Sequence, residues 1–127
     1  MNIDYVLDSS FWLEYFNGTD RGKKAAKIIA DFDLATPITA IAELADKFHR
    51  EKIDFKEFLD FIKLNSVIIQ LTEDIVISAP SLKMELRKKH PDASLTDGIH
   101  LATARSEKGI LITTDRDFSG CEGVEII

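Results

Sequence analysis

Apolar residues follow two patterns that take turns along the chain, one typical of strands and the other typical of helices. Short apolar, β-branched runs predict strands at residues 3–7, 34–37, 66–71, 110–114 and 124–127. Longer stretches with an apolar residue every three or four positions predict helices at residues 11–16, 21–32, 39–50, from 54 onward, 72–89, and from 94 to the glycine at 109. Strands separated by helices predict an α/β domain with a mostly parallel central sheet of four to five strands.

Helix-end residues support several of these boundaries. Ser9 or Ser10 can cap the first helix and Thr39 the third, because a hydroxyl there accepts a hydrogen bond from the free N–H groups. Asp54 marks the start of the fourth helix. Pro80 lies inside the fifth, where its missing N–H predicts a kink or a division.

Length and composition indicate one globular domain spanning residues 1–127. Apolar residues make up 45% of the chain and charged residues 30%, close to the average. The single cysteine excludes an intrachain disulfide. No apolar run approaches the roughly 20 residues of a membrane span, and residues 1–4 lack the basic start and apolar core of a signal peptide. We therefore expect a cytoplasmic protein with no membrane partner.

The charge balance is acidic, with 22 Asp and Glu against 16 Lys and Arg and a net charge of −6. Proteins that coat nucleic acids are normally basic, so this balance excludes a general nucleic-acid coat. It leaves open an enzyme that binds phosphates through metal ions held by carboxylates. The positions of the acids therefore matter more than their number.

Carboxylates follow the two clearest predicted strands. Asp8 ends the strand at 3–7, and Asp115 ends the strand at 110–114, with Asp117 two residues later. Functional sites of parallel α/β sheets form outside the carboxyl ends of the strands. A single Asp there is commonly a turn residue, but two such residues favour a shared site.

Two further acids lie in predicted helices. Asp97 follows Ser94 at the spacing of a capping box, which would make it structural, although a capping acid can also point into a cleft. Glu43 lies in the largely apolar run 38–45, and its structural alternative is a helical pair with Lys47.

Convergence of these acids would require a cation. Carboxylates gathered without bases repel one another, and some would be forced to protonate. An all-oxygen set without histidine or cysteine selects Mg²⁺ or Mn²⁺ over Zn²⁺. The chemistry predicted for such a site is metal-assisted hydrolysis of a phosphoryl group. The acids concerned are Asp8, Glu43, Asp97 and Asp115.

Each of these four acids lies in a recognisable motif. The motifs are Tyr-Val-Leu-Asp-Ser-Ser at 5–10, Thr-Pro-Ile-Thr-Ala-Ile-Ala-Glu-Leu at 36–44, Ser-Leu-Thr-Asp-Gly-Ile-His-Leu-Ala-Thr-Ala at 94–104, and Ile-Thr-Thr-Asp-Arg-Asp-Phe at 112–118. In this order the chain resembles the PIN-domain ribonucleases over nearly its whole length, especially the VapC-type toxins of toxin–antitoxin pairs. The resemblance implies a PIN-like three-layer α/β/α fold.

The resemblance also implies roles for individual residues. It makes Asp8, Glu43, Asp97 and Asp115 the catalytic cluster. Within that cluster, Asp8, Asp97 and Asp115 would bind Mg²⁺ or Mn²⁺, and Glu43 would orient or deprotonate the attacking water or contact a second metal. Family members cleave RNA and leave a 5′ phosphate on one product. The substrate-binding candidates are Ser10, Thr114, Arg116 and Asp117.

Implied partners are an RNA substrate, a cognate antitoxin protein and a second copy of the chain in a homodimer. Trp12, Phe55 and Phe58 are the candidates for an antitoxin surface, with core packing as the simpler alternative. Basic candidates for RNA contact, which solvated helix faces explain equally well, are Arg21, Lys23, Lys24, Lys27, Lys47, Arg50, Lys52, Lys83, Arg87, Lys88 and Lys89.

The predicted function is a metal-dependent endoribonuclease, the toxin component of a type II toxin–antitoxin system. Two alternatives keep the fold: a non-catalytic module that binds RNA or metal, and a PIN nuclease in RNA processing. A phosphoacceptor signalling domain also places acids at strand ends. It would require an acidic pair near Asp8 and a lysine closing the last central strand, and the segment 113–115 provides none.

Overall fold

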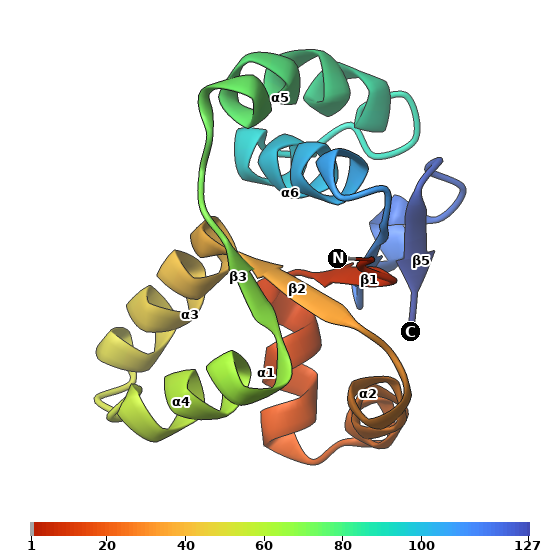
Figure 1. Cartoon of the computed structure of the whole chain (residues 1–127). Helices are drawn as coiled ribbons and strands as arrows, with labels where there is room; N and C mark the ends of the chain where they lie inside the picture. Colours follow the sequence, from red (N-terminus) through yellow and green to blue (C-terminus); the bar gives the residue numbers. More distant parts are fainter. Residues whose placement is uncertain (1) are drawn as a thin grey trace.

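A five-stranded, fully parallel sheet forms the centre of the molecule, as the computed structural model shows for residues 2–127 (Figure 1). The strands are β1 (Tyr5–Leu7), β2 (Leu34–Pro37), β3 (Val67–Ile69), β4 (Ile110–Thr113) and β5 (Val124–Ile126). The helices are α1 (Ser9–Asn17), α2 (Asp20–Asp31), α3 (Ile38–Arg50), α4 (Lys56–Asn65), α5 (Glu73–Leu86) and α6 (Leu95–Ser106), with a short 3₁₀ helix η1 (Arg116–Phe118).

Helices cover both faces of the sheet, so the predicted three-layer α/β/α architecture is confirmed. Alternate strand residues point to opposite faces, and the buried strand residues divide accordingly. Val6 and Leu111 pack with α5 and α6. Leu7 and Ile112 pack with α1 to α4 on the other face. Both cores are therefore continuous with the sheet, which fixes the helices relative to the strand ends.

The order of the strands places a topological switch point between β1 and β4. The sheet runs β3-β2-β1-β4-β5, so the chain first builds outward from β1 through β2 to β3 and then returns to the other side of β1. Ligands of open α/β sheets bind at such a reversal, outside the carboxyl ends of the strands. Leu7 pairs with Ile112, which brings Asp8 level with the end of β4.

Three predictions about helices need correction. Asp8, and not Ser9 or Ser10, is the N-cap residue of α1. Of the kink or division predicted at Pro80, the division is wrong, because α5 is one helix through Pro80. Both Pro80 and Val76 are exposed, so the carbonyl that loses its partner lies on a face where water can bond it. Thr39 does not cap α3, which begins at Ile38. Its hydroxyl instead lies 2.9 Å from the ring Nε2 of His100 on α6.

Trp12 belongs to the core, so its predicted place on a partner surface is wrong. Its side chain is fully buried. The indole N–H donates to Thr36 Oγ1 at 3.1 Å, and this oxygen lies 2.6 Å from Ser66 Oγ. A buried indole requires such a partner for its N–H. The predicted partner residues Phe55 and Phe58 are only partly buried. Within the described residues, no helix has the length and apolarity to cross a bilayer.

Candidate functional site

Asp8 lies at the carboxyl end of β1 and caps α1. Its Oδ1 accepts a hydrogen bond from the backbone N–H of Phe11 at 3.1 Å and one from the hydroxyl of Ser10 at 2.6 Å. Burial raises the pKa of Asp8 above its usual value of 3.8. The hydrogen bonds lower this pKa in part, and the charge of Asp97 raises it further. The surroundings of Asp8 in the fold therefore destabilise the ionised form of its carboxyl group.

Glu43 projects from α3 and is about half exposed, at 47% of its side chain. The hydroxyl of Ser9 donates to its Oε1 at 3.3 Å, and His100 Nε2 lies 3.7 Å from the same oxygen. Burial raises the pKa of Glu43, as do the charges of Asp8 and Asp97, while the Ser9 hydrogen bond lowers it.

Asp97 occupies the first turn of α6 and forms the predicted capping box with Ser94. Its Oδ2 accepts from the Ser94 backbone N–H at 2.8 Å, and Ser94 Oγ accepts from the Asp97 N–H at 3.1 Å. The next residue, Gly98, packs so closely on α5 that a β-carbon there would lie 2.5 Å from the Ala79 carbonyl oxygen. This contact fixes the start of α6, and with it the position of the Asp97 carboxylate.

Asp8, Glu43 and Asp97 come from three elements and lie near enough for Asp97 to raise the pKa of Asp8, and for both aspartates to raise the pKa of Glu43. Their ligand atoms do not close to within 4.8 Å of one another, which in residues 2–127 is seen for His90, Asp115 and Asp117. Within residues 2–127, no lysine or arginine forms an ion pair with these three acids. Burial lowers the pKa of the neighbouring His100 to about 4, which leaves its ring neutral at physiological pH. In residues 2–127 the lysine and arginine ion pairs involve other acids, namely Asp20, Asp46, Glu51 and Glu85.

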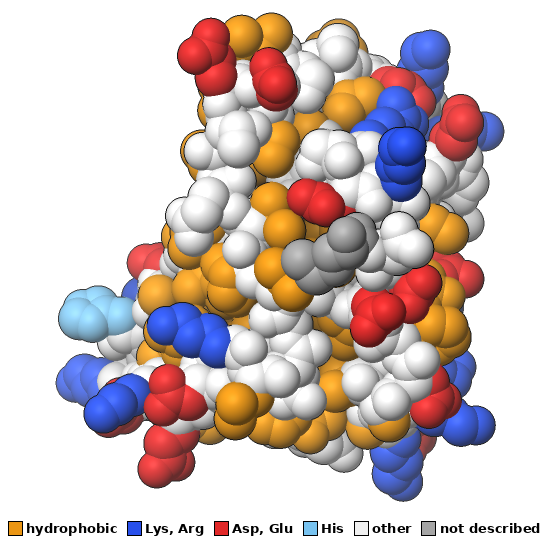
Figure 2. Space-filling model, in the orientation of Figure 1, with side chains coloured by type: hydrophobic (Ala, Val, Ile, Leu, Met, Phe, Trp, Pro, Cys, Tyr) orange, Lys and Arg blue, Asp and Glu red, His pale blue; other side chains and the backbone are white. Residues whose placement is uncertain are grey.

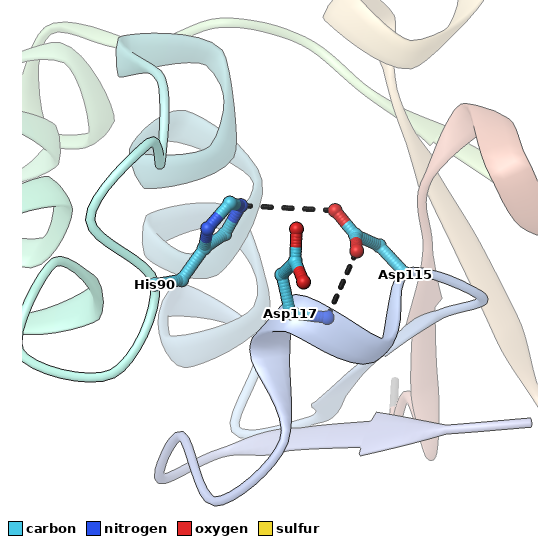
Figure 3. Close-up of side chains that lie close together, drawn as sticks. All are labelled: His90, Asp115 and Asp117. Carbon is cyan, nitrogen blue, oxygen red and sulfur yellow. Dashed lines mark hydrogen bonds and ion pairs between the residues drawn. The ribbon is translucent and has the colours of Figure 1, made fainter.

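Asp115 also lies at the carboxyl end of the sheet, but its carboxylate makes its contacts elsewhere. Its Oδ1 accepts from the backbone N–H of Asp117 at 2.9 Å, and its Oδ2 lies 3.7 Å from Nε2 of His90 (Figure 3). Three of the four predicted acids therefore lie near one another. The fourth, Asp115, belongs to a neighbouring group with His90 and Asp117.

Of the predicted substrate residues, Ser10 is engaged within the fold. Besides donating to Asp8, its Oγ accepts from the backbone N–H of Thr114 at 3.1 Å and so links the start of α1 to the end of β4. The carbonyl of Thr114 accepts from Arg21 at 3.2 Å, which brings this guanidinium of α2 to the end of β4. Arg116 is exposed.

Other basic candidates have structural partners. Lys47 pairs with Glu51 at 3.1 Å, and Arg50 pairs with Asp46 at 3.1 Å, both on the surface of α3. Arg87 donates to the carbonyl of Ala93 at 2.9 Å. These contacts favour solvated helix faces over an RNA surface for these residues.

Sequence reasoning missed three neighbours of the acids. Ser9 and His100 both contact Glu43. The position of His100, three residues after Asp97 on the same helix face, was an available signal. His90 lies in the loop after α5, where no periodic pattern indicated that it would reach Asp115.

Several solved structures have the same fold as this chain over nearly its whole length. A toxin–antitoxin complex from Klebsiella pneumoniae is 22% identical, with a TM-score of 0.75 and 96% of each chain covered. VapBC2 from Rickettsia felis, bound to a fragment of its promoter DNA, is 19% identical, with a TM-score of 0.71 and coverage of 98% of this chain and 99% of that chain. Mycobacterium tuberculosis VapC20, a toxin that cleaves the sarcin–ricin loop, is 17% identical, with a TM-score of 0.72 and coverage of 94% and 95%.

The family assignment rests on the sequence. No curated protein matches the chain. The family model of the PIN domain matches residues 5–122, which include all four predicted acids and the strands β1 and β4. The chain belongs to the PIN domain family.

Proposed function

We propose that this protein is a metal-dependent endoribonuclease and the toxin of a toxin–antitoxin pair. The observation that carries the proposal is the convergence of Asp8, Glu43 and Asp97 at the carboxyl edge of the sheet, where burial and mutual repulsion raise the pKa of Asp8 and Glu43. Membership of the PIN domain family and the toxins among its structural neighbours support it.

The residues fit a divalent metal ion. Their donors are carboxylate oxygens, which suit Mg²⁺ and Mn²⁺, and the unfavourable charge at Asp8 is the kind that a cation offsets. Asp8 and Asp97 would hold the ion, each with one oxygen that the helix caps leave free. Asp115, predicted as a third ligand, would join them only by turning from its contacts with His90 and Asp117.

The side chains around the acids suggest how hydrolysis would proceed. A bound divalent ion lowers the pKa of water and neutralises charge on a phosphate. Glu43, with its raised pKa, would accept the proton of the attacking water. Ser9 and His100 would orient its Oε1. Ser10 would keep Asp8 and the end of β4 in register.

Contacts to the RNA phosphates would come from the cations nearest the carboxyl end of β4. Arg21 reaches the end of β4 by one hydrogen bond to a carbonyl. Arg116 directly follows Asp115 and is exposed. An arginine with free N–H groups can bind a phosphate in bidentate fashion. Both residues would therefore position the RNA backbone.

RNA cleavage tests the nuclease. Purified wild-type protein should cut a mixed RNA pool with Mg²⁺ or Mn²⁺ and not with EDTA, and Asp8→Asn and Asp97→Asn should both lose the activity. Asp46→Asn, at an exposed acid of α3, is the matched control and should cut normally. Cutting that survives both site substitutions would refute the assignment of the site. Folded wild-type protein that cuts no RNA would favour the binding module.

The antitoxin would bind near α4 and the edge strand β3. Hydrophobic side chains reach the surface on the face of the molecule drawn in Figure 2. At α4 and β3, Leu64 is 85% exposed and Val67 is 37% exposed. Phe55 and Phe58 are partly buried, with their rings against Phe48. Expression in bacteria tests the toxin role, because wild-type protein should arrest growth and Asp8→Asn should not. RNA cleavage in vitro without growth arrest would favour the role in RNA processing.

A further inference from the structure

A second group of ligands lies beside the acid cluster, centred on a buried histidine. His90 is 6% exposed, and its ring packs edge-on against Phe118 with the ring centres 4.7 Å apart. In the described part of the chain, the ring faces the carboxylate of Asp115, whose Oδ2 lies 3.7 Å from Nε2. This distance is longer than a hydrogen bond. A buried imidazole is thus aimed at a carboxylate without bonding it.

Asp117 completes the group. The turn of η1 places its carboxylate between His90 and Asp115 (Figure 3). One ligand atom from each of the three residues lies within 4.8 Å of the others. Ligands that share an ion at about 2.1 Å each lie about 3–4 Å apart. Small rotations of the two exposed aspartates would therefore close the site, while packing against Phe118 fixes the imidazole.

A cleft of about 360 Å³ opens onto two members of this group, His90 and Asp117, but is not lined by Asp115. His90, Arg116 and Asp117 are among its lining residues. The cleft lets an ion reach the histidine from solvent. The Asp8 carboxylate, in contrast, makes its hydrogen bonds with Ser10 and Phe11 at the start of α1 and does not line this cleft.

We propose that His90, Asp115 and Asp117 form a second divalent-cation site, which binds a transition-metal ion of the Mn²⁺ or Zn²⁺ type in preference to Mg²⁺. The donor set decides the preference, because imidazole nitrogen suits transition metals, whereas Mg²⁺ takes oxygen ligands and keeps its water. The site does not depend on the proposed nuclease activity.

Mn²⁺ binding to the full-length chain tests the site. Free Mn²⁺ is measured by electron paramagnetic resonance in the Asp8→Asn background, with a large excess of Mg²⁺, so that the acid cluster contributes little. One Mn²⁺ per chain should remain bound. Adding His90→Gln or Asp117→Asn should weaken this binding by more than about tenfold, since loss of even an outer partner of a metal ligand costs that much.

The controls separate metal binding from damage to the fold. His49→Gln, at an exposed histidine of α3, should leave the binding unchanged. Asp117 is exposed, so Asp117→Asn tests the site even where His90→Gln disturbs packing. Unchanged Mn²⁺ binding in both site variants would overturn the proposal, as would complete displacement of Mn²⁺ by Mg²⁺. Failure of RNA cleavage would leave this result unaffected and would count only against the nuclease.

Discussion

Replacing Asp8 by Asn should make the metal-free protein more stable. Burial raises the pKa of Asp8 above its usual value, so the ionised carboxylate is less stable in the folded state than in the unfolded chain. Asn removes the charge and its repulsion with Asp97. It keeps an oxygen that can accept from the Phe11 N–H and the Ser10 hydroxyl, and Asn caps helices as well as Asp.

Asp8→Ala separates the charge from the cap. This variant also removes the repulsion but loses the cap of α1, which costs about 1 kcal/mol. For a domain of this size, that corresponds to about 4 °C in Tm. The Tm of Asp8→Asn should therefore exceed that of Asp8→Ala by about 4 °C and should exceed that of the wild type in EDTA.

Metal binding should reverse the order of thermal stability, so that the wild type becomes more stable than Asp8→Asn. An ion at 100 times its Kd adds about 2.7 kcal/mol, or roughly 10 °C, to a protein that binds it only when folded. This gain should be seen in the wild type and largely lost in Asp8→Asn. Circular dichroism during heating, with EDTA or with Mg²⁺, measures both effects. A lower Tm for Asp8→Asn than for the wild type in EDTA would contradict the unfavourable charge at Asp8. Equal stabilisation of both proteins by Mg²⁺ would contradict metal binding by Asp8.

Three further predictions follow from the same structure. The stability of the metal-free wild type relative to Asp8→Asn should fall as pH rises above 3.8, the usual pKa of Asp8, because the folded state holds this proton more tightly; denaturant titration across pH measures it. Gly98→Ala would place a β-carbon 2.5 Å from the Ala79 carbonyl oxygen. It should cost about 1–3 kcal/mol and reduce RNA cleavage, and normal stability and cleavage would contradict the close packing. Thr36→Val would leave the Trp12 N–H unpaired and should cost about 1–3 kcal/mol in thermal unfolding; an unchanged Tm would show that this hydrogen bond is dispensable.

The parallel sheet and the positions of Asp8 and Asp97 could be predicted from the sequence because they depend on local patterns. The β-branched runs set the strands, and the parallel arrangement brings their carboxyl ends to one edge. Asp8 then follows directly from its position after β1. Asp97 follows from its capping box at the start of α6, which the structure contains.

Features that depend on tertiary packing could not be predicted in this way. The position of Asp115 after β4 was clear, but its side-chain direction is set by η1 and by His90, which comes from a distant loop. Trp12 sits on a helix that is covered on several sides by α2 to α4, so its aromatic neighbours did not indicate which face meets solvent. Pro80 is tolerated because the affected turn of α5 is exposed.

The most direct test of the account is the chemistry of the RNA ends that the purified protein produces. Metal-assisted attack of water at the Asp8, Glu43 and Asp97 site should give products with a 5′ phosphate, only with Mg²⁺ or Mn²⁺, and none with Asp8→Asn. Products with cyclic 2′,3′-phosphate ends, formed equally in EDTA, would show cleavage without a metal and would contradict the proposed site.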